Sequence, residues 1–232
     1  MQIIAPRFLS VAMLALASAI SYADAFNVVM HGINYNSRIG PDWAPKAQKC
    51  KTDAQIEQDM YTIKKMSDSV RIYSLVDCEQ GLPVAKAAKK AGLKLALGIW
   101  TTASSADMDK EIEQLNNIIN AGYLGDNISG FHVGSEAIYR KDITIETAIG
   151  YLNRVRDYLH GRNIWIPMTV ADVVDSYTQY PQLIDAVDYI SINQFSFWER
   201  ADISEGVPTM LDRIKPLRIT AAEKGKKIVI VL

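Results

Sequence analysis

The sequence predicts an α/β fold of the (β/α)8 TIM-barrel type, incomplete here, with about seven strands and the eighth missing. Strand-like runs alternate with helix-like segments whose length suits crossover connections, and this favours parallel strands. The runs at residues 94–100 and 226–232 are apolar on both faces, as in strands that are buried on both sides. A doubly wound sheet is the rival architecture, but no glycine-rich phosphate loop follows the first strand. We therefore expect a barrel without a nucleotide or any other cofactor.

The strands are predicted where short apolar and β-branched runs lie between turn-forming residues. They cover residues 29–36, 69–75, 94–100, 128–134, 164–170, 187–193 and 227–232. The last run reaches the end of the sequence, so we expect a barrel domain over residues 26–232 that is truncated before its eighth strand.

The helices are predicted from apolar residues at helical spacing, as with Ile56, Met60 and Ile63, and from stop signals such as Gly92. They cover residues 53–66, 83–91, 106–121, 144–160, 180–186 and 207–224. The last helix is expected to be interrupted near Pro216, because proline lacks the backbone N–H that a helix interior needs.

Composition excludes some classes of partner. The chain is 49% hydrophobic and 22% charged, which is ordinary for one globular domain of this length. A net charge of −1 provides no basic surface for nucleic acid and no polybasic patch for a membrane.

Residues 1–25 have the pattern of a secretory signal peptide. Arg7 precedes an apolar stretch at residues 8–20, and Ala23 and Ala25 are the small residues of a cleavage site before Phe26. The alternative is a membrane anchor, but the apolar stretch is shorter than the roughly 20 residues that a span needs. We expect a secreted, extracellular protein, free or associated with a cell wall, that has no membrane contact after cleavage.

Secretion affects how the two cysteines and one asparagine are interpreted. Cys50 and Cys78 form an even pair, and a disulfide is the simplest assignment in an oxidising compartment. Asn127 begins an N-glycosylation sequon. Two thiols alone are a weak basis for a metal site, so none is expected.

The run at residues 128–134 delivers the carboxylate of Glu136 to its own C-terminal end, where (β/α) barrels carry their chemistry. Further motifs occur in order at the ends of the predicted strands. They are Gly32-Ile33-Asn34-Tyr35, Val70-Arg71-Ile72-Tyr73-Ser74 with Asp77-Cys78, Leu97-Gly98-Ile99-Trp100, Val133-Gly134-Ser135-Glu136, Thr169-Val170-Ala171-Asp172 and Asn193-Gln194-Phe195-Ser196-Phe197-Trp198. Together they resemble glycoside hydrolase family 17, the β-1,3-glucanases and glucanosyltransferases, and most closely its microbial cell-wall branch.

The resemblance implies a secreted, retaining β-1,3-glucan hydrolase of the endo type, or a transglycosylase, with Glu136 as general acid/base. Its substrate would be β-1,3-glucan polysaccharide or oligosaccharide. Without the resemblance, a lone glutamate here would be interpreted as a surface residue that opens a loop.

The chain departs from the family at two points. Ser135 replaces an asparagine, which weakens an expected contact with the sugar. The family's nucleophile glutamate follows the seventh strand, where this sequence stops at Leu232. A retaining mechanism needs two carboxyl groups about 5–5.5 Å apart, so we expect no activity from this fragment. The alternative function is a non-catalytic β-glucan-binding protein with a degenerate cleft.

Aromatic residues form the second signal for sugar binding, because flat rings pack on the C–H faces of sugars. Those at or just after predicted strand ends are Tyr35, Tyr73, Trp100, Tyr139, Phe195, Phe197 and Trp198. The polar candidates for sugar binding are Arg71, Ser135, Asp172 and Asn193. Arg71 is also expected to pair with a cleft carboxylate and orient it.

Overall fold

The computed structural model describes residues 30–231. Its sheet has seven parallel strands in the order of the chain, each paired with the next. The strands are β1 (Ile33–Asn34), β2 (Ser69–Arg71), β3 (Lys94–Ile99), β4 (Ile128–Ser135), β5 (Met168–Val173), β6 (Ile190–Asn193) and β7 (Ile228–Val231). The predicted signal peptide lies outside the described residues.

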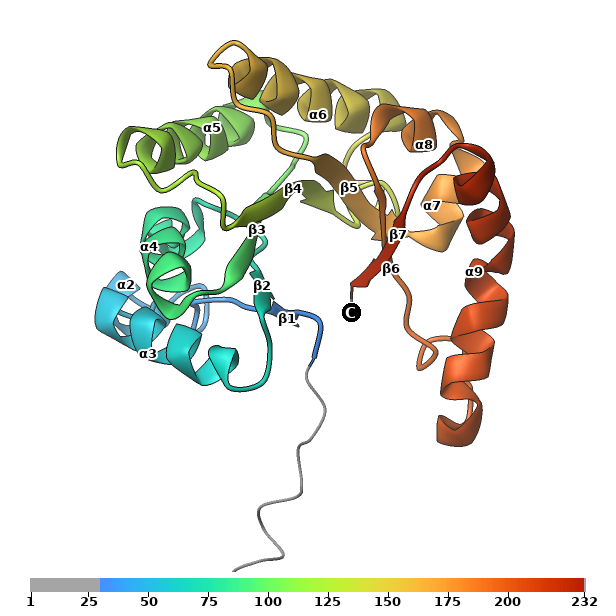
Figure 1. Cartoon of the computed structure of the whole chain (residues 1–232), viewed down its shortest axis with the longest axis horizontal. Coiled ribbons are helices and arrows are strands. Elements are labelled where there is room, and N and C mark those ends of the chain that lie inside the picture. The colour runs from blue at the N-terminus through green and yellow to red at the C-terminus, as the bar shows by residue number, and fades with distance from the viewer. Residues whose placement is uncertain (1–29, 232) are drawn as a thin grey trace, which may run out of the picture.

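Helices surround the curved sheet on its outer side, and β1 and β7 form its two ends (Figure 1). The α-helices are α2 (Lys46–Lys49), α3 (Asp53–Lys64), α4 (Gly81–Ala91), α5 (Ser105–Asn120), α6 (Ile145–His160), α7 (Val174–Gln179), α8 (Gln182–Ala186) and α9 (Gly206–Glu223). Two 3-10 turns, η1 (Asp77–Glu79) and η2 (Ile203–Glu205), lie in the loops after β2 and β6. The predicted incomplete (β/α) barrel is confirmed.

Local sequence signals explain several helix ends. Thr52 accepts a hydrogen bond from the backbone of Gln55, and the Gln55 side chain accepts one from the backbone of Thr52, which is a capping box for α3. Thr144 caps α6 in a similar way through Thr147. Gly92 ends α4 in the left-handed conformation that glycine adopts without steric cost.

The fifth strand was predicted over residues 164–170, but it begins and ends later, at Met168–Val173. β5 begins at Met168, because Pro167 has no N–H for the sheet and contributes only its carbonyl, which accepts from Phe131. The apolar residues before it are used elsewhere: Trp165 is exposed and stacks on the ring of His160 at 3.8 Å.

The predicted break near Pro216 was also wrong, since α9 continues through this residue. Ile214, Leu217 and Ala221 are buried on both sides of the proline, so packing holds the helix together despite the lost hydrogen bond. Within residues 30–231, no helix is long and apolar enough to cross a membrane.

The core lies between the sheet and its helices. Met60 of α3 and Leu152 of α6 are fully buried in it, and so are Leu95, Leu97 and Phe131 of the strands. These residues belong to one continuous apolar cluster. The cluster fixes the strand ends, and the candidate site is built on those ends.

Candidate active site

Glu136 follows β4 at the carboxyl end of the sheet. Its backbone N–H donates to the carbonyl of Ala171 at 2.8 Å, which extends the pairing of β4 with β5 by one residue. Gly134 and Glu136 have φ values of 92° and 55°, a conformation that glycine tolerates and that strains glutamate. A Cβ at position 134 would lie 2.9 Å from the hydroxyl of Thr101, so the sharp turn requires glycine there. The neighbouring Ser135 is buried.

The Glu136 carboxylate is held between two polar side chains. The Asn193 amide donates to Oε1 at 2.5 Å, and the Arg140 guanidinium lies 3.9 Å from Oε2. The carboxylate side chain keeps 25% of its surface exposed, whereas Asn193 is buried. The arrangement orients the acid and leaves it open to a ligand. Asn193, predicted as a sugar contact, therefore positions Glu136.

Arg140 is a site residue that the sequence analysis missed. Its N–H donates to the Glu136 carbonyl, so one helical turn brings the guanidinium back toward the carboxylate. The guanidinium also lies 5.4 Å from the Trp100 ring centre, in cation–π contact, and pairs with Asp142 at 2.9 Å. The available signal was its position four residues after Glu136.

Asp172 was predicted as a sugar contact, but it is fully buried. Its carboxylate accepts hydrogen bonds from the Ile138 N–H at 3.0 Å, from its neighbour Val173 and from the Ser176 hydroxyl. Burial raises the pKa of Asp172, and these hydrogen bonds oppose the rise. The residue holds the loop that follows Glu136 and has no surface for a sugar.

Tyr35 was also predicted to reach the barrel mouth, and it does not. The ring is buried in the core between the sheet and α3, and its hydroxyl donates to Asp59 at 2.8 Å. Neighbouring strand residues point to opposite faces, so Tyr35 points outward and its neighbour Asn34 points into the barrel.

Arg71 lies inside the barrel, with 5% of its surface exposed. It donates to Asn34 at 3.4 Å, and its guanidinium lies 4.6 Å from the ring centre of Tyr73. Burial lowers its pKa, and the nearby Tyr73, Tyr189 and Glu136 oppose this effect. The expected ion pair with a cleft carboxylate is absent from residues 30–231, since an amide is the hydrogen-bond partner.

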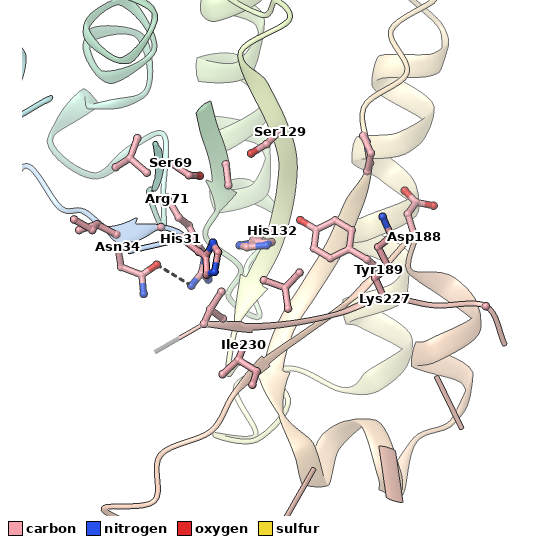
Figure 2. A pocket seen from close by; sticks show the side chains of 18 residues that line it. His31, Asn34, Ser69, Arg71, Ser129, His132, Asp188, Tyr189, Lys227 and Ile230 are labelled. Carbon is pink, nitrogen blue, oxygen red and sulfur yellow. Dashed lines mark hydrogen bonds between the residues drawn. The ribbon is translucent and has the colours of Figure 1, made fainter. Parts of the chain in front are cut away.

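A cavity of about 770 Å³ occupies the barrel interior next to Arg71 (Figure 2). His132 and Tyr189 point into it, with ring centres 5.9 Å apart. Nδ1 of His132 and Nε of Arg71 are buried with no hydrogen-bond partner in the described residues. Burial, and to a smaller extent the charge of Arg71, hold the pKa of His132 well below its usual value. Besides these two rings, the cavity is lined by charged, polar, small and aliphatic side chains.

A second cavity, of about 670 Å³, lies over the carboxyl ends of β1 to β3. Tyr73 and Trp100 line it, and polar side chains from the adjoining loops complete it. Trp100 also contacts Arg140, so the cavity adjoins the Glu136 site. Tyr139, Phe197 and Trp198 are strongly exposed, and the last two rings meet edge to face with centres 5.0 Å apart.

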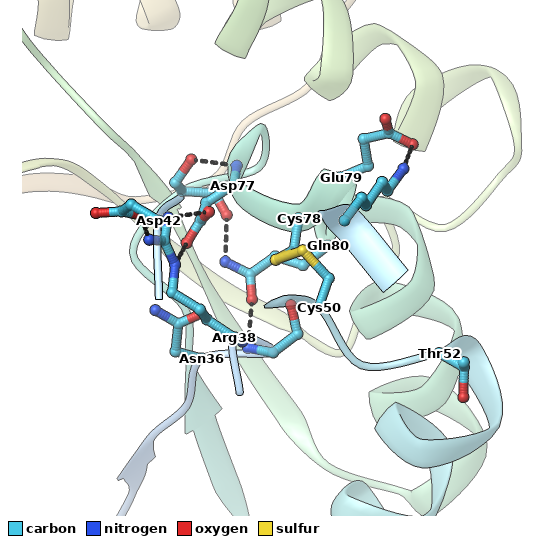
Figure 3. Close-up of a disulfide and its surroundings, with 12 residues drawn as sticks. Asn36, Arg38, Asp42, Cys50, Thr52, Asp77, Cys78, Glu79 and Gln80 are labelled. Atoms are coloured by element: carbon cyan, nitrogen blue, oxygen red, sulfur yellow. Dashed lines mark hydrogen bonds and ion pairs between the residues drawn. A yellow bond between two sulfur atoms is a disulfide. The ribbon is translucent and has the colours of Figure 1, made fainter. Parts of the chain in front are cut away.

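Cys50 and Cys78 form a disulfide, with Cα atoms 5.5 Å apart (Figure 3). It joins the loop after β1 to the loop after β2, both of which border the second cavity. Arg38 donates to both carboxylate oxygens of Asp77, at 2.6 and 3.3 Å. Gln80 accepts from the N–H of Ser37 and donates to the Ser74 carbonyl. The rim of the second cavity is therefore fixed by a covalent bond and a hydrogen-bond network.

The predicted glycosylation at Asn127 conflicts with its burial. Both polar atoms of its side chain are buried and without hydrogen-bond partners in the described part of the chain. A glycan on the amide nitrogen would need the segment before β4 to move. Within residues 30–231, no group of three or more His, Cys, Asp or Glu is arranged to hold a metal ion.

The model of the BtgE/BtgC glycoside hydrolase domain matches residues 32–231. A glucan 1,3-β-glucosidase of Arthroderma benhamiae is 27% identical over 91% of this chain and 66% of its own length. A putative glucan endo-1,3-β-glucosidase, btgC, of Aspergillus niger is 28% identical over 65% of this chain. The chain spans only 22% of that second relative.

Two solved structures have a similar fold. An active-site mutant of the Rhizomucor miehei β-1,3-glucanosyltransferase, in complex with laminaritriose, superposes with a TM-score of 0.72 at 25% identity. The match covers 87% of this chain and 70% of that one. A second structure of the Rhizomucor miehei enzyme, described as a member of glycoside hydrolase family 17, gives a TM-score of 0.70. The chain therefore belongs to the BtgE/BtgC glycoside hydrolase family, within glycoside hydrolase family 17.

Proposed function

We propose that the chain binds β-1,3-glucan across the carboxyl ends of its strands, with Glu136 as the general acid/base of a retaining endo-glucanase site. One observation carries the proposal: a partly exposed carboxylate at the end of β4, oriented by Asn193, stands beside a cavity walled by Tyr73 and Trp100. Relatives described as acting on 1,3-β-glucan support this substrate class.

The chemistry follows from the geometry at Glu136. In its protonated form the carboxyl group would donate to the leaving glycosidic oxygen. Asn193 holds Oε1, and Arg140 approaches Oε2 without a hydrogen bond, so the outer oxygen remains open to a ligand. The exposed rings of Tyr139, Phe197 and Trp198 offer flat surfaces for further sugar units.

A retaining reaction also needs a second carboxylate, about 5–5.5 Å from the first. Asn193 and Arg140, the described side chains that contact Glu136, are not carboxylates, and Asp172 is buried and holds a loop. We propose that the 232-residue chain binds glucan and has no measurable turnover. The 232-residue chain would then act as a glucan-binding protein, which is the alternative function.

We place the protein outside the cell, in contact with cell-wall glucan. The signal-like residues 1–25 support export, and the Cys50–Cys78 disulfide suits an oxidising compartment. This location predicts that the mature protein is found in the culture medium or wall fraction, with an N-terminus at Phe26. Retention of the protein inside the cell would contradict it.

Calorimetric titration with laminaritriose tests the binding. We expect Trp100→Ala to weaken affinity roughly tenfold, by loss of the ring platform. Trp165→Ala is the matched control: an exposed tryptophan that precedes β5, away from the carboxyl ends. Glu136→Gln should retain binding. Equal affinity of wild type and Trp100→Ala would contradict the proposed binding site. Laminarin hydrolysis that Glu136→Gln abolishes would contradict the absence of turnover and would support Glu136 as the acid/base.

A further inference from the structure

Glu111 of α5 is a buried acid that the proposed reaction does not use. Only 2% of its surface is exposed, yet it belongs to the lining of the cavity over β1 to β3. Its Oε1 accepts a hydrogen bond from the Ser74 hydroxyl at 2.5 Å, and its Oε2 accepts one from the Leu75 N–H at 2.8 Å. One helix side chain thus binds the start of the loop after β2.

The hydrogen bonds continue from Ser74 along that loop. Its hydroxyl accepts from the backbone N–H groups of Val76 at 3.1 Å and Asp77 at 2.9 Å. Its carbonyl accepts from Gln80 at 2.9 Å. Because Asp77 pairs with Arg38 across the rim, the network that begins at Glu111 extends to the loop after β1.

The same carboxylate lines the cavity together with Trp100, which follows β3. Burial raises the pKa of Glu111 to about 7, and the hydrogen bonds from the Ser74 hydroxyl and the Leu75 N–H oppose the rise. Glu111 therefore holds the backbone just after Tyr73 and lines the same cavity as the aromatic walls, Tyr73 and Trp100.

We propose that Glu111 is a positioning residue that sets the spacing of Tyr73 and Trp100, so that the cavity between them accepts one glucosyl unit of β-1,3-glucan beside Glu136. The proposal rests on the proposed function, because it assigns a ligand to the same cleft. It differs from a purely structural role by its expected effect: a folded Glu111 variant binds the sugar more weakly.

The test compares Glu111→Gln with Glu113→Gln, the same chemical change at an exposed position of α5. We expect Glu111→Gln to weaken laminaritriose binding roughly tenfold, because the amide nitrogen cannot accept a hydrogen bond from the loop. Glu113→Gln should bind like wild type. Ser74→Ala removes only the bridging hydroxyl and should weaken binding by a smaller factor, about threefold.

Leu152→Ala, in the core under α6, is the control for general destabilisation. It should lower the melting temperature and leave affinity unchanged. A folded Glu111→Gln with wild-type affinity would overturn the proposal. Equal losses of affinity in Glu111→Gln and Leu152→Ala would overturn it as well. If Glu111→Gln does not fold, wild-type affinity in Ser74→Ala overturns the proposal.

If wild type binds no laminaritriose, the proposed function fails and Glu111 is judged separately. NMR signals of the Tyr73 ring and Trp100 indole should then shift in Glu111→Gln and stay in place in Glu113→Gln. Unchanged signals in both variants would refute the positioning role on its own.

Discussion

The two cavities of this barrel differ in chemistry more than in size. The interior cavity, of about 770 Å³, is larger than the cavity of about 670 Å³ over β1 to β3. The interior one holds Arg71 and His132 with unpaired buried polar atoms, whereas the outer one has aromatic walls and an acid, Glu111, whose oxygens are both bonded. Sugar recognition needs rings and oriented polar groups, so the smaller cavity is the better candidate.

The disulfide gives the largest expected effect. Replacing Cys50 and Cys78 by alanine should lower the free energy of unfolding by about 3–4 kcal/mol, for a loop of 28 residues. Urea unfolding of both forms measures this, and laminaritriose affinity should fall in parallel because the rim loosens. An unchanged unfolding midpoint would mean that the hydrogen bonds alone fix the rim.

Glu111 should make the outer cavity sensitive to pH. Its pKa is raised from 4.5 to about 7, so the folded state favours the neutral acid. The resulting stabilisation is complete below pH 4.5 and is lost as the pH rises through 7. Relative to Glu111→Gln, wild type should lose on the order of 3 kcal/mol across this range.

Urea unfolding of both forms at pH 4.5, 6 and 7.5 measures this effect of Glu111. The other charged groups of the cavity, Arg38, Asp77, Asp107 and Lys110, are common to both proteins and cancel to first order in the difference. A difference that does not vary with pH would contradict the assignment.

His132 should make the interior cavity respond in the opposite direction. Its pKa in the folded state is depressed, so its stabilising contribution is present above pH 6.5 and is lost as the pH falls. Relative to His132→Asn, wild type should lose stability as the pH falls from 6.5 to 5. Urea unfolding of both proteins over this pH range measures the difference. If wild type instead loses stability as the pH rises, His132 is not buried as a neutral imidazole.

The smallest effect is expected at the mouth of the cleft. Trp198→Ala should weaken laminaritriose binding about fivefold, because its exposed ring is one of several sugar platforms. Trp165→Ala is again the control. Titration calorimetry measures both, and an equal loss in the two variants would indicate nonspecific binding to tryptophan.

The sequence predicted the alternation of strands and helices well, because apolar spacing and capping residues such as Thr52 are local signals. The predicted start of β5 was too early. Ile164 and Ile166 have the composition of strand residues, but Pro167 has no N–H to pair, so the strand begins at Met168. That effect depends on the partner strand, which local patterns do not identify.

Site residues were harder to predict because side-chain direction depends on register. A shift of one residue turns a strand side chain to the other face, which is why Tyr35 faces α3. Glu111 was missed although a signal existed: with Met108, Leu115 and Ile118 it falls on the buried stripe of α5. An acidic residue within the apolar stripe of a helix predicts a buried carboxylate that makes specific hydrogen bonds.

Chemical-shift mapping with laminaritriose tests the central claim most directly. The glucan is predicted to shift signals of Tyr73, Trp100 and Glu136, and to leave those of His132 and Tyr189, inside the barrel, in place. Shifts confined to His132 and Tyr189 would place the ligand in the larger cavity and contradict the account.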